Sequence, residues 1–260
     1  MTIFFNPPTL TLLFANLPIS VRKASSSNAS ISSCDLRALT TSHKGLKFVD
    51  SIDASGSSPF SIKTGIMIVP KDAAGDKFIA QVQSHVAEQK VGPLLNKGIA
   101  TRFTEAISSI SKAKGVKVLT GVTNPDGYGV TPSIFVVDWE DVKNHDDLLE
   151  EHFGPTSVII RAEFSQYLSI AKAMSGQLAS AVHAGSNEDV KDLVSALTQL
   201  AGRLIWNGFP TSVSVTAAQN HGGQWPASSS HTTSVGLDAL YRFVRPVVYQ
   251  NFPDNLLPAE

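Results

Sequence analysis

The sequence predicts an α/β fold in which a mostly parallel sheet is covered by helices on both faces. Short apolar runs typical of buried strands alternate with amphipathic segments of about 10–15 residues, which is the pattern of successive β-α-β units. Parallel strands joined in this way need right-handed crossovers, and these place helices on both faces of the sheet. Hydrophobic residues make up 42% of the 260 residues, which is ample for such a core.

The first predicted elements are a strand followed by two helices. Residues 65–70 form an apolar run closed by proline, which indicates a buried strand. Residues 76–89 and 101–114 carry apolar side chains at helical spacing, and Gly115 is expected to end the second of these helices. The Gly-Pro pair in residues 92–95 predicts a turn between the two helices.

The second half continues the alternation and ends in a weaker element. Its expected elements, in chain order, are strands at 116–119, 133–137 and 157–160, a helix at 165–174, an extended segment at 178–182, a helix from 186 to about 200 and a strand at 203–206. Residues 243–249 alternate in character but contain Pro246, which cannot donate to a ladder, so they predict an edge strand at most.

Charge and cysteine content exclude several classes of function. The net charge is −1, from 21 basic and 22 acidic side chains, so no field favours nucleic acid or an anionic membrane. Cys34 is the single cysteine, so no internal disulfide can form, and a reducing compartment such as the cytoplasm is expected. His183 and His221 have no second ligand at metal-binding spacing, so no metal is predicted.

Residues 1–44 predict a leader ahead of a domain that covers residues 45–260. The segment is rich in serine and has no acidic residue before Asp35. Its apolar part is too short to span a bilayer, and its basic residues follow that part, the reverse of a secretory signal. We expect a disordered or non-native leader, and the alternative is an organellar transit peptide.

The motif Glu151-His152-Phe153-Gly154-Pro155 carries the first functional signal. It resembles the Glu-x-Phe-Gly-Pro motif of the aldehyde dehydrogenases. That resemblance implies a cofactor, NADP or NAD, whose nicotinamide ribose would bond to Glu151 and whose nicotinamide would lie against Phe153. A carboxylate suits this task, because its two oxygens can accept bonds from both ribose hydroxyls. In isolation, Glu151 would read as a solvated acid at a helix end.

Agreement elsewhere extends the resemblance from about Gly65 to the C-terminus. Residues 91–95 and 201–208 are similar to the Gly-Pro segment and the Ala-Gly-x-x-x-x-Asn strand of the family. Residues 221–227, 232–236 and 245–253 resemble the branch that oxidises α-ketoglutarate semialdehyde, also named 2,5-dioxovalerate. The resemblance therefore implies a small aldehyde as substrate and 2-oxoglutarate as product.

Residue 61 departs from the family at the position of the nucleophile. The resembled segment is Gly-Gln-Phe-Cys-Thr-x-Pro-Gly, and the matching residues are Ser58-Pro59-Phe60-Ser61-Ile62-Lys63-Thr64-Gly65. Ser61 thus occupies the position of the family's cysteine. A hydroxyl needs an adjacent base to attack a carbonyl, whereas a thiol is partly ionised near neutral pH. An ordinary loop serine is the simpler interpretation of Ser61, and Cys34, in a serine-rich segment, is a spare cysteine.

Two hypotheses follow for the function, and whether the chain is an enzyme stays open between them. The family's dinucleotide-binding domain lies upstream of the nucleophile, and no Gly-x-Gly-x-x-Gly follows a predicted strand here. The first hypothesis is a truncated dehydrogenase with impaired or no activity. The second is an inactive interaction module that pairs through residues 243–249, as a homo-oligomer or with a full-length relative. A serine esterase is disfavoured, because no Gly-x-Ser-x-Gly elbow exists.

Overall fold

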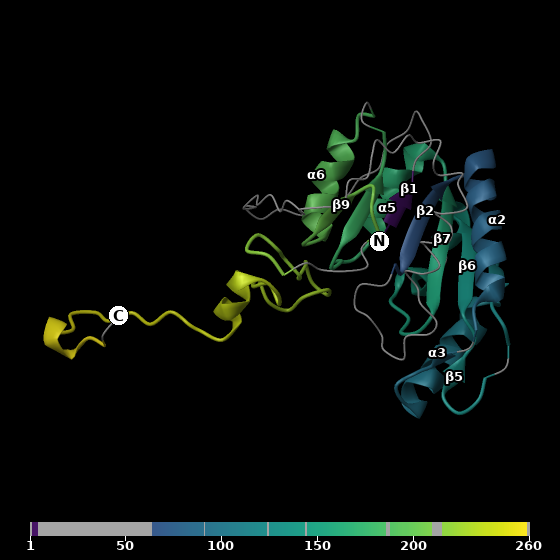
Figure 1. Ribbon diagram of the computed structural model, residues 1–260. Coiled ribbons are helices and arrows are strands. Elements are labelled where there is room, and N and C mark those ends of the chain that lie inside the picture. Colours follow the sequence, from purple (N-terminus) through teal and green to yellow (C-terminus); the bar gives the residue numbers. More distant parts are fainter. Residues whose placement is uncertain are drawn as a thin grey trace.

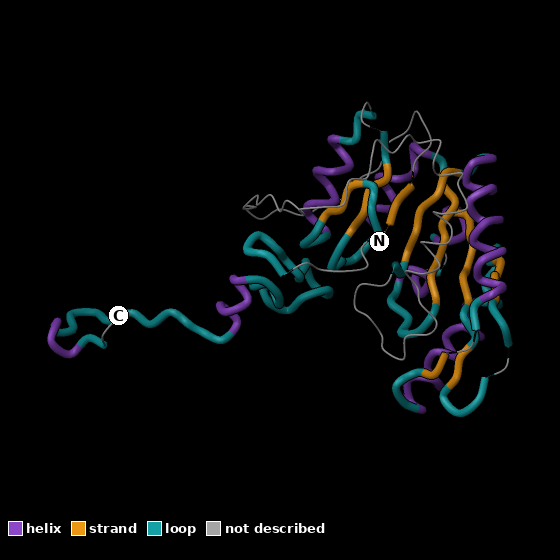
Figure 2. Tube along the Cα trace, viewed as in Figure 1, coloured by secondary structure: helices purple, strands orange, loops and turns teal. Residues whose placement is uncertain are grey.

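The computed structural model describes residues 2–4, 64–90, 92–123, 125–143, 145–185, 188–209 and 215–258. Seven strands form the main sheet in the order β4-β6-β7-β2-β1-β8-β9. Figure 2 draws the strands in orange and the helices around them in purple. The strands are β1 Thr2–Phe4, β2 Ile66–Pro70, β4 Lys117–Thr120, β6 Ser133–Asp138, β7 Thr156–Ala162, β8 Ser180–His183 and β9 Leu204–Trp206. All neighbours are parallel except β4 and β6, so the predicted mostly parallel α/β fold is confirmed.

Helices and one small ribbon surround the sheet (Figure 1). The α-helices are α2 Ala73–Glu88, α3 Lys97–Ile110, α4 Trp139–Val142, α5 Tyr167–Ala173 and α6 Lys191–Leu200. The 3-10 helices are η2 Asp146–Leu149, η3 Phe164–Gln166, η4 Leu237–Arg242 and η5 Asp254–Leu256. A separate antiparallel ribbon pairs β3 Gly92–Pro93 with β5 Gly129–Val130 beside α3.

Alternate residues of the central strands point into two cores. Met67 and Val69 of β2 pack with α2 on one face, in a cluster that also contains Phe78 and Val82. The neighbouring Ile66 and Ile68 point to the other face, where side chains of α4, α5 and α6 cover them. Burial on both faces explains why the strands read as continuous apolar runs rather than as alternating ones.

The helix boundaries follow from the capping residues. Asp72 accepts bonds from the backbone N–H groups of Ala74 and Gly75, at 2.8 and 3.0 Å, and thereby starts α2. Asn96 accepts a bond from Ile99 N at 3.0 Å, so α3 begins at Lys97, four residues before the predicted start. The same helix ends at Ile110, and Gly115, at φ +80°, lies in the turn beyond it.

Strand β1 differs from the expectation for the N-terminal segment. Thr2–Phe4 lies between β2 and β8 and is parallel to both, with Ile3 opposite Ile68 and Val182. The sequence assigned residues 1–44 to a leader outside the domain, whereas three of these residues are part of the sheet. A three-residue strand carries too little periodicity to be detected in a segment of mixed composition.

The C-terminal tail projects from the body of the molecule (Figure 1). No strand is assigned to residues 243–249, where the sequence predicts an edge strand at most. Phe243 and Val248 are 84% and 86% exposed, and Pro246 removes one N–H from the segment. The tail therefore presents apolar side chains to solvent in this structure.

Candidate functional site

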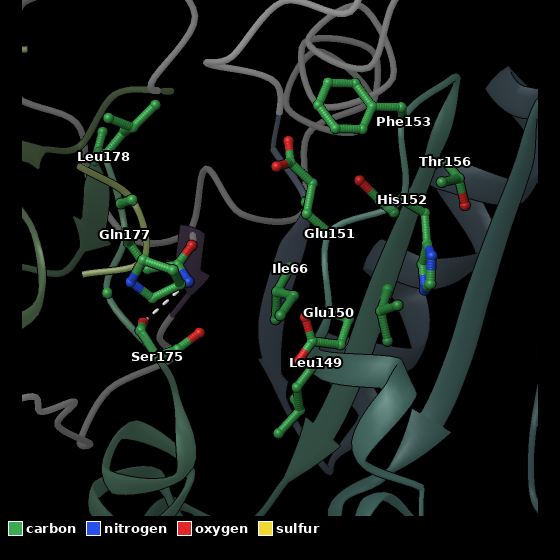
Figure 3. A pocket seen from close by; sticks show the side chains of 17 residues that line it. Ile66, Leu149, Glu150, Glu151, His152, Phe153, Thr156, Ser175, Gln177 and Leu178 are labelled. Carbon is green, nitrogen blue, oxygen red and sulfur yellow. Dashed lines mark hydrogen bonds between the residues drawn. The ribbon is translucent and has the colours of Figure 1, made fainter. Parts of the chain in front are cut away.

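A cavity of about 360 Å³ opens at the amino ends of the parallel strands. Figure 3 shows its labelled lining residues on two facing walls, with Glu151 and Phe153 on one and Ser175, Gln177 and Leu178 on the other. The lining residues are Gly65, Ile66, Leu149, Glu150, Glu151, His152, Phe153, Thr156, Ser157, Val158, Ser175, Gly176, Gln177, Leu178, Ala179, Pro226 and Ala227.

The predicted cofactor residues both reach this cavity. Glu151 and Phe153 line the same wall, and the Phe153 ring is 49% exposed. Ser61 lies outside the described residues. Gly65 and Ile66, four and five residues after Ser61, line the cavity at the start of β2.

Hydrogen bonds and packing fix the loop that carries Glu151 and Phe153. The Gly154 carbonyl accepts a bond from Thr156 N at 2.8 Å, and the Pro155 carbonyl accepts one from Ser133 N at 3.0 Å. Gly154 itself has φ +132°, and a Cβ there would stand 2.4 Å from Cδ2 of Phe103 on α3. The ring of Phe103 therefore lies directly against the backbone of the loop, which only glycine allows.

Close backbone approaches build the opposite wall. Gln177 forms a parallel bridge with Ala201, and Ala201 forms an antiparallel bridge with Gly223, so three chain segments lie side by side. A Cβ on Gly223 would stand 2.2 Å from the Gln177 carbonyl oxygen. Another on Gly176 would stand 2.0 Å from the Gln224 carbonyl oxygen. These contacts hold Pro226 and Ala227 at the cavity.

The sequence did not identify several polar groups of the cavity. His152 occupies the variable position of the motif, and its Nε2 lies 3.1 Å from the carbonyl oxygen of Asp147. Gln177 and Ser175 reach the cavity from the segment before β8. Ser175 and Gln177 could have been predicted from their position just before a strand. Parallel strands begin at the same end of the sheet, so residues that precede different strands come together there.

The carboxyl edge of the sheet is occupied by an ion-pair network. Arg161 bonds to Asp76 at 2.7 Å and to Asp138 at 3.0 Å, and Lys71 contacts Asp138 at 3.0 Å and Glu140 at 3.2 Å. A bond from Gln166, a backbone bond and Lys71 together lower the pKa of Glu140 to about 2. Ligands of open α/β sheets usually bind at the carboxyl edge. Here the cavity lies at the opposite end of the strands.

The described part of the chain contains neither a cluster of metal-binding side chains nor a membrane-spanning helix. Over those residues, no three His, Cys, Asp or Glu side chains gather as a metal site would need. The buried ring of His183 lies 5.2 Å from that of Phe209, centroid to centroid. None of the described helices has the length and apolar character needed to cross a bilayer.

Comparisons with known proteins agree with this architecture. Residues 69–246 match the model of the aldehyde dehydrogenase family. The α-ketoglutaric semialdehyde dehydrogenase of Acinetobacter baylyi is 33% identical over 209 residues, which are 78% of this chain and 40% of that protein. Alpha-ketoglutaric semialdehyde dehydrogenase 2 of Azospirillum brasilense is 31% identical over 216 residues, 81% of this chain and 41% of that protein. The chain thus spans about two-fifths of the length of these relatives.

Solved structures share the fold at lower identity. A putative methylmalonate-semialdehyde dehydrogenase from Sinorhizobium meliloti 1021, complexed with NAD, superposes with a TM-score of 0.64 at 17% identity. The match covers 83% of this chain and 46% of that one. Proline utilization A from Bdellovibrio bacteriovorus gives a TM-score of 0.61 at 21% identity, over 84% of this chain and 23% of that one. With the family match over residues 69–246, the chain belongs to the aldehyde dehydrogenase family.

Proposed function

We propose that this chain binds the nicotinamide half of NAD or NADP and a small aldehyde. Both would bind in the cavity at the amino ends of the parallel strands. The observation that carries the proposal is that Glu151 and Phe153 line one cavity together with Gly65 and Ile66. Ser61, at the position of the family's nucleophile, lies only four residues before Gly65. In the family, the cofactor supplies the acceptor for the hydride that leaves the aldehyde carbon.

The residues of the cavity fit such a ligand in size and chemistry. A volume of about 360 Å³ lies within the range of about 300–1,000 Å³ for small-molecule sites. The Glu151 carboxylate can accept two hydroxyl bonds at once, as a ribose diol requires. The half-exposed ring of Phe153 offers an apolar face to a flat heterocycle.

The proposed aldehyde ligand is 2,5-dioxovalerate, the compound that the resembled branch of the family oxidises to 2-oxoglutarate. Two relatives at 33% and 31% identity are named for α-ketoglutaric semialdehyde, the same compound. The likeness of residues 221–227, 232–236 and 245–253 to that branch supports the same choice.

Turnover by residues 1–260 is proposed to stay at background, because Ser61 stands in place of a thiol. A serine hydroxyl is almost fully protonated at neutral pH and needs a neighbouring base before it can add to the carbonyl. With the thiol, that first bond forms from a partly ionised group. The proposal therefore separates ligand binding, which Glu151 and Phe153 support, from catalysis.

Binding is tested with NADH and nicotinamide mononucleotide by titration calorimetry. We expect Glu151→Gln to weaken binding roughly tenfold, since a bond to a charged group contributes about 1.5–3 kcal/mol. Glu105→Gln is the matched control, because Glu105 is exposed on α3 and is not one of the lining residues. Equal dissociation constants for the wild type and Glu151→Gln would remove the assigned role of Glu151.

Catalysis is tested by absorbance at 340 nm with 2,5-dioxovalerate and NAD⁺ or NADP⁺. We expect the wild type, Ser61→Ala and Cys34→Ala to give the same background rate, and Ser61→Cys to raise it. A rate above background that survives Ser61→Ala and Cys34→Ala together would show that the assignment of residue 61 to the nucleophile position is wrong.

The exposed tail supports a second function, that of an interaction module. Residues 243–249 expose Phe243, Val247 and Val248, and an extended apolar segment can add to the sheet of another chain. We propose pairing as a homo-oligomer or with a full-length relative. Light scattering should show association that Val248→Asp reduces, while Asp254→Asn, beyond the segment, leaves it unchanged. A monodisperse monomer in both wild type and variants contradicts this second function.

A further inference from the structure

Arg203, His221 and Arg242 come from neighbouring segments: the bridge between Ala201 and Gly223 joins the first two segments, and the charges of both arginines act on His221. We propose that Arg203, His221 and Arg242 form a binding site for the carboxylate group of a small organic acid. Neither the family assignment nor the proposed cofactor pocket requires this site, so the two proposals stand or fall separately.

Backbone contacts bring Arg203 and His221 together. The side-chain amide of Asn220 donates to the Gly202 carbonyl oxygen at 2.9 Å. A Cβ on Gly202 would stand 2.2 Å from the Gly222 carbonyl oxygen. Residues 220–222 therefore lie directly on the segment that contains Arg203, and His221 is at the centre of that contact.

Arg242 reaches the same place from η4. Its Nε and Nη2 both donate to the Thr232 carbonyl oxygen, at 3.2 and 3.1 Å. The next residue, Thr233, is buried, and its hydroxyl oxygen accepts a bond from His221 N at 2.8 Å. The guanidinium group is thus fixed by two bonds beside the loop that holds the histidine.

The electrostatics of the cluster agree with this placement. Desolvation lowers the pKa of His221, and the positive charges of Arg203 and Arg242 lower it further. Burial also lowers the pKa of the Arg203 guanidinium. Asp238, half-buried on the same 3-10 helix as Arg242, is the acidic residue of this segment.

The cluster lies one strand away from the cavity. Gln177 pairs with Ala201, and Ser180 pairs with Leu204 in the same register. This register places Arg203 opposite Ala179. Ala179 lines the cavity, and neighbouring strands are about 4.8 Å apart. The described lining of the cavity contains Glu150 and Glu151 but neither lysine nor arginine.

Guanidinium groups favour a carboxylate because their planar N–H donors match its two oxygens. The hydroxyls of Ser234 and Thr232 belong to the same loop, where they bond to the His221 carbonyl oxygen and to Ser230 Oγ. Phosphate is the competing anion, with more acceptor oxygens and more charge than a carboxylate. The experiment therefore compares the binding of phosphate with that of a dicarboxylate.

The experiment titrates the whole chain with glutarate, with its neutral diamide and with inorganic phosphate, all at constant ionic strength. Titration calorimetry should detect glutarate and not the diamide, and phosphate should bind more weakly than glutarate. Arg242→Gln should weaken glutarate binding roughly tenfold, as expected for a lost charge-assisted bond. Arg245→Gln, on the exposed tail three residues later, is the matched control and should bind as the wild type does.

Three outcomes would overturn the proposal. Glutarate and its diamide could bind with equal affinity, or phosphate could bind at least as tightly as glutarate. The third is that Arg242→Gln and Arg245→Gln weaken glutarate binding equally. Arg203→Gln is a second variant with the same expected loss, used with circular dichroism if Arg242→Gln does not fold. Glu151→Gln must leave glutarate binding unchanged, so failure of the cofactor proposal and failure of the carboxylate site give different results.

Discussion

Replacing Gly154 by alanine tests how the loop of Glu151 and Phe153 is held. The backbone there has φ +132°, a conformation that costs an L-residue about 1–3 kcal/mol. The new methyl group would also stand 2.4 Å from Cδ2 of Phe103, where carbon atoms prefer about 3.5–4.0 Å. Overpacking of this kind costs about 1–3 kcal/mol. Together the two effects predict a loss of roughly 2–6 kcal/mol in the free energy of unfolding.

Urea unfolding followed by tryptophan fluorescence measures this loss, because Trp139 is 4% exposed and reports on the core. Gly127→Ala is the matched control: Gly127 has φ +57°, but nothing lies within 4 Å of a Cβ placed there. It should cost only about 1–2 kcal/mol, the backbone part of the effect.

A double-mutant cycle separates the clash from the backbone strain. The single substitution Phe103→Leu should itself lower the free energy of unfolding. In the Phe103→Leu background, however, Gly154→Ala should lower it by about 1–3 kcal/mol less than in the wild type, because the aromatic ring is absent. Additive effects within about 0.5 kcal/mol, or equal losses for Gly154→Ala and Gly127→Ala, would refute the reasoning.

Three further predictions address the core, the carboxyl edge and the cavity wall. Ile160→Ala removes a fully buried side chain and should cost about 2–5 kcal/mol in urea unfolding, whereas Leu240→Ala, which is 64% exposed, should stay within about 0.5 kcal/mol. The pKa of Glu140 is lowered to about 2 from 4.5, so the folded state binds fewer protons than the unfolded state between these values. Its contribution is complete above about pH 4.5 and is lost as the pH falls toward 2. The difference in Tm between the wild type and Glu140→Gln should therefore shrink over that interval, and a constant difference would contradict this. Gly223→Ala should raise hydrogen exchange in residues 221–227 and leave β6 unchanged, because its Cβ would stand 2.2 Å from the Gln177 carbonyl oxygen. Unchanged exchange in the loop would show that the close approach does not hold the wall.

Most of the fold could be predicted from the sequence, because its strands are buried on both faces. The runs at 66–69, 134–137 and 158–160, inside strands β2, β6 and β7, are apolar without interruption. Helix limits were less accurate where capping decided them. Asn96 starts α3 four residues earlier than the apolar periodicity indicates, because the first turn of that helix carries Lys97 and Gly98.

The cavity was predicted only in part. A contiguous motif revealed Glu151 and Phe153, whereas Gln177 and Pro226 reach the same space from segments far apart in the sequence. Only the register of the sheet and the cross-bridge from Ala201 to Gly223 bring them together. Strand β1 was missed for a related reason, since its place depends on the gap between β2 and β8 and not on its own pattern.

The direction of β1 has a practical consequence for anyone who fuses a tag to this chain. Because β1 runs parallel to β2, whatever is attached ahead of Thr2 must emerge on the side where β2 begins, next to Ile66 and the mouth of the cavity. An affinity label at that end would compete with ligands for access. The opposite terminus, which extends away from the body in Figure 1, can carry a reporter without reaching the cavity.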